Sequence, residues 1–302
     1  MRHLIDAKDL APDYVLKLIE SANGIIGDPR RYGAACAGKI LAVLFYEPST
    51  RTRLSFESAM LGLGGSATGF SSQEMSSASK GESVADTIRV ISCYADVCAI
   101  RHHKEGAALA ASIYSKIPVI NAGDGGHQHP TQTLTDLLTI HSVKKKLDGL
   151  VVGMCGDLKF GRTVHSLIHA MSKHKNNSFI LVSPDELKIP DYLREEMTRD
   201  GVRFTETEDL TRSIGEMDIL YMTRVQRERF FNEEDYVRLK DTYILNRQKL
   251  AHARDDLAVM HPLPRLSEIA AEVDADPRAI YFEQVRYGRY IRMALILDLL
   301  AQ

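Results

Sequence analysis

Short apolar runs alternate with helical patterns along most of this chain of 302 residues, and that alternation most constrains its fold. Strand–helix alternation is typical of an α/β protein, in which parallel sheets are covered by helices on both faces. We expect strands at 40–45, 66–70, 96–100, 117–120, 149–155, 178–182, 218–222, 257–260 and 279–282. We expect helices at 8–23, 52–62, 82–94, 105–115, 131–146, 162–173, 187–199 and 287–302.

The number of strands and the chain length together favour two smaller sheets over one continuous sheet. The Gly-rich segment 121–126, which precedes a long helical pattern, is the best junction between two domains. We therefore expect a first domain at 1–130 that is completed by the C-terminal helix at 286–302, and a second domain at 131–285. Each domain would be a parallel β-sheet flanked by helices. The lysines at 144–146 are expected to lie at a solvated helix end.

Composition and charge exclude several classes of protein. The formal net charge of −2 argues against a nucleic-acid-binding protein, which is usually basic. No apolar run approaches the ~20 residues that span a bilayer, and the N-terminus lacks the apolar core of a signal peptide. Cys36, Cys93, Cys98 and Cys155 form no Cys-x-x-Cys pair and lie in or near apolar stretches. We expect reduced, buried thiols in a cytoplasmic protein, without a zinc site.

The sequence Ser-Thr-Arg-Thr-Arg at 49–53 follows the first apolar run and precedes a helical pattern. Ser49, Thr50, Arg51 and Thr52 would therefore stand at a helix N-terminus, where free N–H groups and the positive end of the helix dipole meet. Hydroxyls and a guanidinium at that point are suited to hold a phosphate dianion. Ser and Thr also cap helices routinely, but three hydroxyls and two arginines within five residues favour an anion site.

Polar residues also follow other expected strands in both halves, at the points where those strands end. Because ligands of open parallel sheets bind beyond the carboxyl ends of the strands, this pattern predicts an active site in a cleft between two domains. Arginine grips phosphate or carboxylate groups with two hydrogen bonds, so the many arginines indicate anionic substrates. The strand-end residues are Arg101, the segment 121–124, Asp157 with Arg162, Arg224 with Gln226, and the segment 261–265.

His129 follows the Gly-rich loop and precedes a helix start with Pro130 in its first turn, so its ring could donate a hydrogen bond to a carbonyl oxygen. A structural histidine, satisfied by backbone groups, is the alternative. His127 and His129 form a His-x-His pair, but no acidic or Cys partner lies at useful spacing, so we expect no metal. The segment 153–161 lacks the Gly-x-Gly-x-x-Gly spacing of a dinucleotide loop, so we expect no cofactor.

Three of these motifs resemble signatures of the aspartate/ornithine carbamoyltransferase family, in order and at family-like spacing. They are the segment 49–53, the His-Pro-Thr-Gln segment 129–132 and the His-Pro-Leu-Pro segment 261–264. The last two favour the aspartate branch, because the ornithine branch has Cys in their third and second positions respectively. The segments 80–83, 156–166 and 221–226 are similar to the aspartate branch as well, so the resemblance covers nearly the whole chain.

The resemblance implies that the carbamoyl group of carbamoyl phosphate is transferred to the amine of L-aspartate, without metal or cofactor. The products would be N-carbamoyl-L-aspartate and phosphate, in an early step of pyrimidine biosynthesis. The first domain would bind carbamoyl phosphate and the second would bind aspartate. The resemblance also implies a homotrimer with shared active sites, with regulatory chains or a higher assembly left open.

Site residues follow from the same resemblance. Ser49, Thr50, Arg51 and Thr52 would hold the phosphate, and Thr52, Arg101 and His129 would polarise the carbonyl oxygen. Gln132 and the backbone carbonyls of Pro262 and Leu263 would take the carbamoyl NH2. Arg162, Arg224, Gln226 and Lys80 would bind aspartate, with Ser76 and Lys80 supplied by a neighbouring subunit. Arg53 and Glu82 would support these groups, and no role falls on His127.

Three alternatives stay open at this point. An ornithine carbamoyltransferase would need an acidic or thiol partner for the distal amine of ornithine, in place of Arg162, Arg224 and Lys80. A catalytically inactive scaffold of the same family would be expected to lose its phosphate-binding residues, whereas every expected position is filled. A dinucleotide-dependent dehydrogenase is suggested by the α/β pattern alone.

Overall fold

The computed structural model describes residues 2–126, 128–225 and 243–301, and the chain forms two compact units. The first comprises Met1–Leu138 and Arg286–Gln302, and the second comprises Thr139–Val285. The first boundary lies inside helix α5 (Pro130–Lys144), whereas the sequence analysis placed it at the start of that helix. The second boundary lies inside helix α11 (Tyr281–Leu300).

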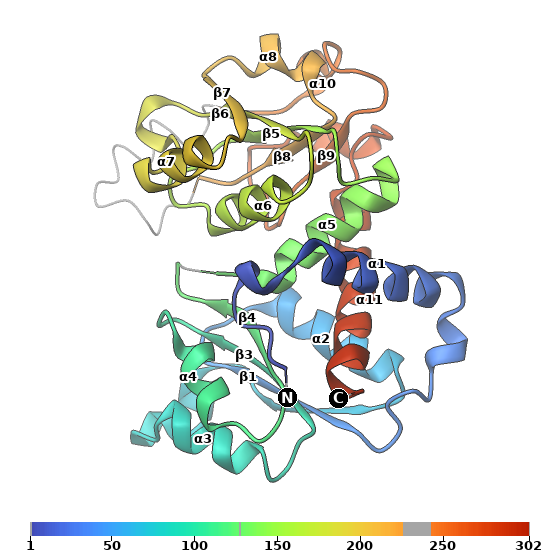
Figure 1. Ribbon diagram of the computed structural model, residues 1–302, viewed down its shortest axis with the longest axis vertical. Coiled ribbons are helices and arrows are strands. Elements are labelled where there is room, and N and C mark those ends of the chain that lie inside the picture. The colour runs from blue at the N-terminus through green and yellow to red at the C-terminus, as the bar shows by residue number, and fades with distance from the viewer. Residues whose placement is uncertain (1, 127, 226–242, 302) are drawn as a thin grey trace. The chain divides into compact units, whose positions relative to one another are not determined.

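The first unit is built on a four-stranded parallel sheet in the order β2-β1-β3-β4 (Figure 1). Alternate residues of the central strand β1 point to opposite faces of the sheet. Ala42 and Leu44 pack with helices α3 and α4, while α2 contacts β1 and β2 from the other face. The strands are β1 (Ile40–Phe45), β2 (Ser66–Phe70), β3 (Val97–His102) and β4 (Val119–Asp124). The helices are α1 (Pro12–Gly27), α2 (Thr50–Gly62), α3 (Val84–Ile91) and α4 (Ala107–Tyr114).

The second unit is built on a five-stranded parallel sheet in the order β7-β6-β5-β8-β9. One core cluster packs residues of β5, β6, β8 and β9 against α8 and α10, while α6 and α7 lie at the other face of the sheet (Figure 1). The strands are β5 (Val151–Cys155), β6 (Ser178–Val182), β7 (Arg203–Thr207), β8 (Ile219–Met222) and β9 (Ala258–Met260). The helices are α6 (Arg162–Ser172), α7 (Asp191–Arg199), α8 (Leu210–Ser213) and α10 (Arg247–Leu250).

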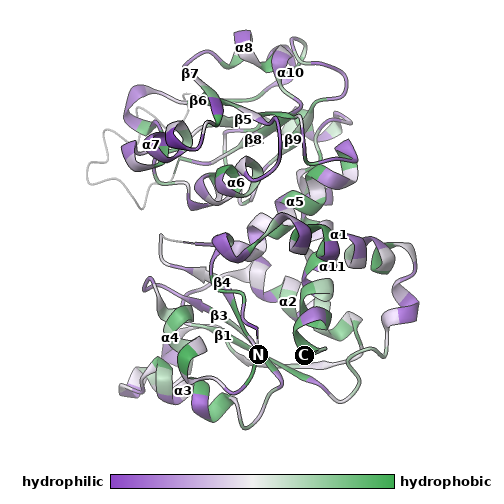
Figure 2. Ribbon diagram, in the orientation of Figure 1, coloured by the Kyte–Doolittle hydropathy of each residue, from purple (hydrophilic) through white to green (hydrophobic). Residues whose placement is uncertain are grey.

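Short 3-10 helices join several of these elements. They are η1 (Ala7–Asp9), η2 (Pro29–Tyr32), η3 (Gln73–Met75), η4 (Ser77–Lys80), η5 (Asp185–Leu187), η6 (Ile214–Glu216) and η8 (Ala271–Ala275). The central strands are hydrophobic along most of their length (Figure 2), as expected for parallel strands that are covered on both faces. The prediction of two parallel α/β sheets flanked by helices is confirmed.

The structure departs from the predicted elements in several places. The segment 279–282 is not a strand: Ala279 makes a single bridge to Val259, and α11 begins at Tyr281. Strand β7 was missed, because its residues alternate between exposed and half-buried positions and contain no apolar run. Helix α1 begins at Pro12 rather than at residue 8, because η1, capped by the Asp6 side chain, occupies 7–9.

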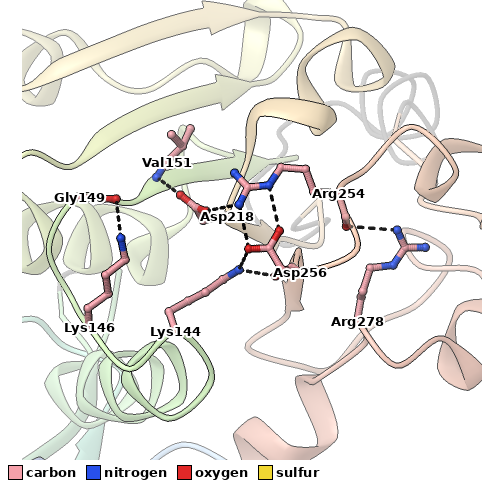
Figure 3. Close-up of polar contacts among 8 residues, drawn as sticks. All are labelled: Lys144, Lys146, Gly149, Val151, Asp218, Arg254, Asp256 and Arg278. Carbon is pink, nitrogen blue, oxygen red and sulfur yellow. Dashed lines mark hydrogen bonds and ion pairs between the residues drawn. The ribbon is translucent and has the colours of Figure 1, made fainter.

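An ion cluster fixes the amino-terminal edge of the second sheet (Figure 3). Asp218 accepts a hydrogen bond from the N–H of Val151 at 2.8 Å and pairs with Arg254 at 3.2 Å. Arg254 and Lys144 both pair with Asp256, and the Lys144 side chain is only 9% exposed. The expectation that Lys144 is solvated is therefore wrong. These charges are used in folding, at the edge opposite to the one where open sheets bind ligands.

The four cysteines are all free thiols. Cys36, Cys98 and Cys155 are buried, as predicted, whereas Cys93 is exposed and departs from that prediction. Cys93 lies just past the end of α3, where its Sγ is 3.5 Å from the carbonyl oxygen of Arg89.

His102, at the end of β3, makes the stability of the protein depend on pH. Its Nδ1 accepts the N–H of Lys104 at 2.9 Å, and its ring packs on Tyr46 and His103. Burial lowers the pKa of His102 to about 4. The charges of His103 and Lys104 also lower this pKa, whereas the charge of Asp124 raises it. Because the unfolded chain keeps the ordinary pKa of 6.5, it binds more protons than the folded protein between pH 6.5 and 4. The free energy of unfolding therefore falls as pH drops through this window.

We expect the melting temperature of His102→Asn to fall less steeply with acidification than that of the wild type. The amide oxygen of Asn can still accept the Lys104 N–H, while the titrating ring is gone. One proton of linkage is about 1.4 kcal/mol per pH unit, so the difference should reach about 4 °C per pH unit. Thermal unfolding between pH 7.5 and 4.5 measures it, with the exposed His252→Asn as control. Equal slopes for wild type and His102→Asn would contradict this account.

Candidate active site

In the first unit the direction of the chain across the sheet reverses between β1 and β3. Strand β1 leads through α2 to β2 on one side, whereas β3 leads through α4 to β4 on the other side. Adjacent parallel strands whose connections diverge leave a crevice beyond their carboxyl ends, and open α/β sheets bind ligands there. Phe45 and Arg101 are paired in register at this point, and the segment 49–53 follows directly after β1.

The predicted anion site lies at the N-terminus of α2. Ser49 occupies the N-cap position in extended conformation, but its side chain makes no capping hydrogen bond to the described first turn. The interpretation of Ser49 as a side-chain cap is therefore wrong. The first N–H groups of a helix have no acceptors within the helix, and they attract anions together with the dipole. Thr50 and Arg51 are exposed here, and Thr52 is buried.

Arg101 is a largely buried cation at this edge, with a side chain that is 12% exposed. Its Nη2 lies 2.5 Å from Oε1 of Glu47, and its Nη1 donates to the carbonyl oxygen of Ala122 at 3.3 Å. Burial lowers the pKa of Arg101, and Glu47 opposes that shift. The Nε–H of Arg101 is buried and has no acceptor among the described residues. A buried donor of this kind is the group that a ligand oxygen can satisfy.

His129 immediately precedes α5, as the sequence predicts, and is 6% exposed. Its Nδ1 lies 3.5 Å from Oγ1 of Thr131, which in turn accepts a hydrogen bond from Nη2 of Arg292 at 3.3 Å. Arg292 also donates to Ser55 of α2 at 3.2 Å. Burial lowers the pKa of Arg292 to about 10, so its guanidinium stays charged at neutral pH. Arg292 thus connects the first turn of α5 to α2, although the sequence analysis did not single it out.

Gln132 lies one turn after His129 on α5. Its Nε2 donates to Oδ1 of Asp136 at 2.8 Å, and Asp136 is fully buried. That bond fixes the amide so that its oxygen is the acceptor on the remaining side. The supporting residues have partners of their own: Arg53 donates to Glu57 at 2.7 Å, and Glu82 accepts from Thr87 at 2.7 Å.

Ser76 and Lys80 lie in the exposed loop that follows β2. The Oγ of Ser76 donates to the carbonyl oxygen of Gln73 at 2.8 Å and accepts the N–H of Ala78 at 3.3 Å. Lys80 ends η4 and is exposed. Met75, the last residue of η3, is 73% exposed.

In the second unit the chain direction reverses between β5 and β8. Arg162 is the first residue of α6, which follows β5, and Arg224 follows β8; both are half-buried. The N–H and the hydroxyl of Thr223 both donate to the carbonyl oxygen of Cys155, at 2.9 and 3.0 Å. A Cβ on Gly156 would lie 2.5 Å from the carbonyl oxygen of Thr223. Glycine there allows the two strand ends to approach, so the connections that carry the two arginines begin side by side. Gln226 lies outside the described residues.

Pro262 and Leu263 follow β9, in the loop of the His-Pro-Leu-Pro motif. The Leu263–Pro264 peptide bond is cis, and Leu263 has a φ of 56°, in the left-handed region. Arg265 is held by Asp274 and by the hydroxyl of Tyr281, at 2.9 Å from the latter, so it has a structural role in this loop.

One residue and one pairing at the candidate site were missed because their partners are distant in sequence. Arg292 stands in the apolar run 291–296, and that unusual setting is the one signal that could have marked it as a paired, buried charge. The pairing of Glu47 with Arg101 has no local signal, since it depends on the register of β1 with β3. Among residues 2–126, 128–225 and 243–301, no group of three or more metal-ligating side chains is found. No described helix is long and apolar enough to cross a membrane.

The chain matches two family models across both units. Residues 2–142 match the aspartate/ornithine carbamoyltransferase carbamoyl-P binding domain, and residues 148–299 match the Asp/Orn binding domain of the same family. A relative from Clostridium kluyveri, named aspartate carbamoyltransferase catalytic subunit, is 64% identical over 299 residues, which are 99% of this chain and 98% of the relative.

Solved structures agree over the same length. The catalytic subunit of the aspartate transcarbamoylase of M. jannaschii has a TM-score of 0.93 and 45% identity, over 100% of this chain and 98% of that one. The Trypanosoma cruzi aspartate transcarbamoylase, in complex with carbamoyl phosphate and aspartate, has a TM-score of 0.91 and 37% identity, over 99% and 96% of the two chains.

Fold and site therefore define an α/β protein that carries arginine side chains and a helix N-terminus at the carboxyl ends of two parallel sheets. With both family models matched across nearly its full length, the chain belongs to the aspartate/ornithine carbamoyltransferase family.

We expect Arg51→Ala to weaken the binding of inorganic phosphate about 10- to 100-fold, because a hydrogen bond to a charged group contributes about 1.5–3 kcal/mol. Isothermal titration calorimetry of the folded variant measures the dissociation constant. Arg31→Ala, an exposed arginine of η2 in the same unit, is the matched control and should bind phosphate like the wild type. Undiminished phosphate affinity in Arg51→Ala would remove the N-terminus of α2 as the anion site.

Proposed function

We propose that the protein transfers the carbamoyl group of carbamoyl phosphate to the amine of L-aspartate, giving N-carbamoyl-L-aspartate and phosphate. The observation that carries this proposal is identity of 59–64% along the whole chain with relatives named aspartate carbamoyltransferase catalytic subunit. The first unit binds carbamoyl phosphate and the second binds aspartate. The reaction is an early step of pyrimidine biosynthesis.

The phosphate of carbamoyl phosphate binds at the N-terminus of α2, to Ser49, Thr50, Arg51 and Thr52. The carbonyl oxygen is polarised by Thr52, Arg101 and His129. The buried, unsatisfied Nε–H of Arg101 supports this assignment, because a donor there gains an acceptor when substrate binds. The carbamoyl NH2 donates to the side-chain oxygen of Gln132, whose NH2 is already held by Asp136, and to the carbonyl oxygens of Pro262 and Leu263.

Aspartate brings two carboxylates, and Arg162 and Arg224 bind them, with Gln226 and Lys80. Both arginines lie on the connections that follow β5 and β8 and diverge to opposite sides of the sheet. A ligand of the second sheet would bind at this point. Two anionic substrates repel each other, and the guanidinium groups offset that repulsion.

Chemistry proceeds by attack of the neutral amine of aspartate on the carbamoyl carbon, followed by departure of phosphate. Negative charge grows on the carbonyl oxygen and on the leaving phosphate in the transition state. Fixed donors aimed at both places stabilise it, by about 3–4 kcal/mol for each well-placed donor. The amine must contact the carbamoyl carbon, so the two substrates have to be held next to each other before they react. The leaving phosphate accepts the proton of the amine.

Direct assay of the two amino acids separates the branches of the family. We expect carbamoylation of L-aspartate and none of L-ornithine, because ornithine offers one carboxylate to a site with two arginines and adds a distal cation. Arg224→Ala should lower kcat/KM for aspartate about 100-fold, consistent with loss of one charge-assisted pair. The exposed Arg203→Ala is the control. Product from ornithine in place of aspartate would overturn the assignment.

The minimal assembly is a homotrimer in which Ser76 and Lys80 complete the site of a neighbouring subunit. The exposed loop at 71–80, with its exposed Met75 and Lys80, supports this part of the proposal, since both side chains gain partners on another chain. Further association with regulatory chains is compatible with a trimer. The four free cysteines are compatible with the reducing cytoplasm as the compartment.

Mixed trimers test the shared site. Lys80→Ala and His129→Ala should each be nearly inactive alone. After dissociation and reassembly of an equal mixture, a site with wild-type His129 and a neighbour's wild-type Lys80 forms with a probability of about one in four. Activity should therefore return to about a quarter of the wild-type value. Two inactive variants that stay inactive after mixing and verified subunit exchange would contradict a shared site.

A further inference from the structure

A buried histidine–glutamate pair stands behind the loop that carries Pro262 and Leu263. Nε2 of His261 and Oε1 of Glu268 are 2.8 Å apart, and their side chains are 1% and 6% exposed. His261 directly follows β9, and its backbone N–H donates to Oε1 of Gln284 at 3.0 Å. The backbone of His261 is therefore held by α11 as well as by the sheet.

The hydrogen bonds define the tautomer of His261. The N–H of Leu263 donates to Nδ1 of His261 at 2.7 Å, so Nδ1 is the acceptor and carries no proton. The proton is then on Nε2 and is donated to Glu268. The other carboxylate oxygen, Oε2, accepts the N–H of Leu266 at 3.0 Å. A continuous series of hydrogen bonds thus runs from Leu263 through His261 and Glu268 to Leu266.

These hydrogen bonds hold Leu263 in a backbone conformation that leucine does not adopt readily. Leu263 has a φ of 56°, where a Cβ is disfavoured. Such a conformation persists only when the surroundings fix it, and it tends to occur at ligand-binding sites. The bond from the Leu263 N–H to His261 orients the peptide between Pro262 and Leu263, and therefore the direction of the Pro262 carbonyl on the opposite side of that peptide.

We propose that His261 and Glu268 are positioning residues, which orient the carbonyl oxygens of Pro262 and Leu263 to accept the carbamoyl NH2 of the substrate. The inference rests on the proposed function, which supplies the role of those two carbonyls. It predicts that the pair distinguishes an NH2 group from a methyl group at the same place, because only NH2 can donate to the carbonyls. A purely structural pair would affect all ligands of the protein alike.

Acetyl phosphate provides the comparison. It keeps the phosphate and the carbonyl oxygen of carbamoyl phosphate and replaces NH2 with CH3. His261→Asn can still accept the Leu263 N–H through its amide oxygen, but it is too short to reach Glu268. Glu268→Gln keeps the size of the side chain and loses the charge that fixes the ring. In both variants we expect kcat/KM for carbamoyl phosphate to fall about 10- to 100-fold, as for a misplaced binding group.

The inhibition constant of acetyl phosphate, measured as a competitor of carbamoyl phosphate, should stay within about twofold of the wild type in both variants, since its binding needs neither carbonyl. His252→Asn and the exposed Glu195→Gln are matched controls on the second unit and should behave as wild type in both assays. Parallel losses for carbamoyl phosphate and acetyl phosphate, or an unchanged kcat/KM in a folded variant, would overturn the proposal.

A measurement on the wild-type protein covers the case in which the variants do not fold. Nitrogen NMR of 15N-histidine-labelled protein should find His261 neutral, with the proton on Nε2. A proton on Nδ1 would overturn the proposal, since the Leu263 N–H could not then donate to it. Failure of the proposed function would be distinct, because the wild type would carbamoylate no aspartate. An active wild type with unaffected variants would remove only the positioning role.

Discussion

Parallel pairing of β1 with β3, and of β5 with β8, decides where this chain can bind a ligand. Backbone hydrogen bonds in each pair bring two carboxyl ends together, and the connections that follow diverge to opposite sides of the sheet. The N-terminus of α2 and the guanidinium of Arg101 lie at the carboxyl ends of β1 and β3. Arg162 and Arg224 lie at the carboxyl ends of β5 and β8. Residues that are far apart in sequence become neighbours by this pairing alone.

Charge at these points has to be compensated before any substrate arrives, because burial makes an unpaired ion costly. Glu47 pairs with Arg101, and hydroxyl groups of the two helices α2 and α5 accept hydrogen bonds from Arg292. The same contacts hold the donors of the site in fixed directions. On the first unit, ions that stabilise the fold thus stand beside the proposed ligand-binding residues, whereas the cluster around Asp218 and Asp256 lies at the amino-terminal edge of the second sheet.

How far sequence predicts this structure depends on whether a feature is local. Strands such as 40–45 and 178–182 were found because buried parallel strands are continuous apolar runs, and the N-terminus of α2 was found because its residues are contiguous. The prediction of a strand at 279–282 was wrong, because a short apolar run fits the first turn of a buried helix equally well. The ring of His261, the pair of Glu47 with Arg101 and the contacts of Arg292 could not be predicted, since each depends on partners brought together by the fold.

Strand β7, which has no apolar run, has a consequence for the behaviour of the protein in concentrated solution. It is the outer strand of its sheet, and Glu206 in it pairs with Arg194 of α7 at 3.1 Å. At the corresponding edge of the first sheet, β2 reads Ser-Ala-Thr-Gly-Phe. Outer strands with unpaired backbone groups are templates for another chain, and charged or polar, short strands resist such pairing. The polar composition of β7, which prevented its prediction from the sequence, thus protects the protein against edge-to-edge aggregation.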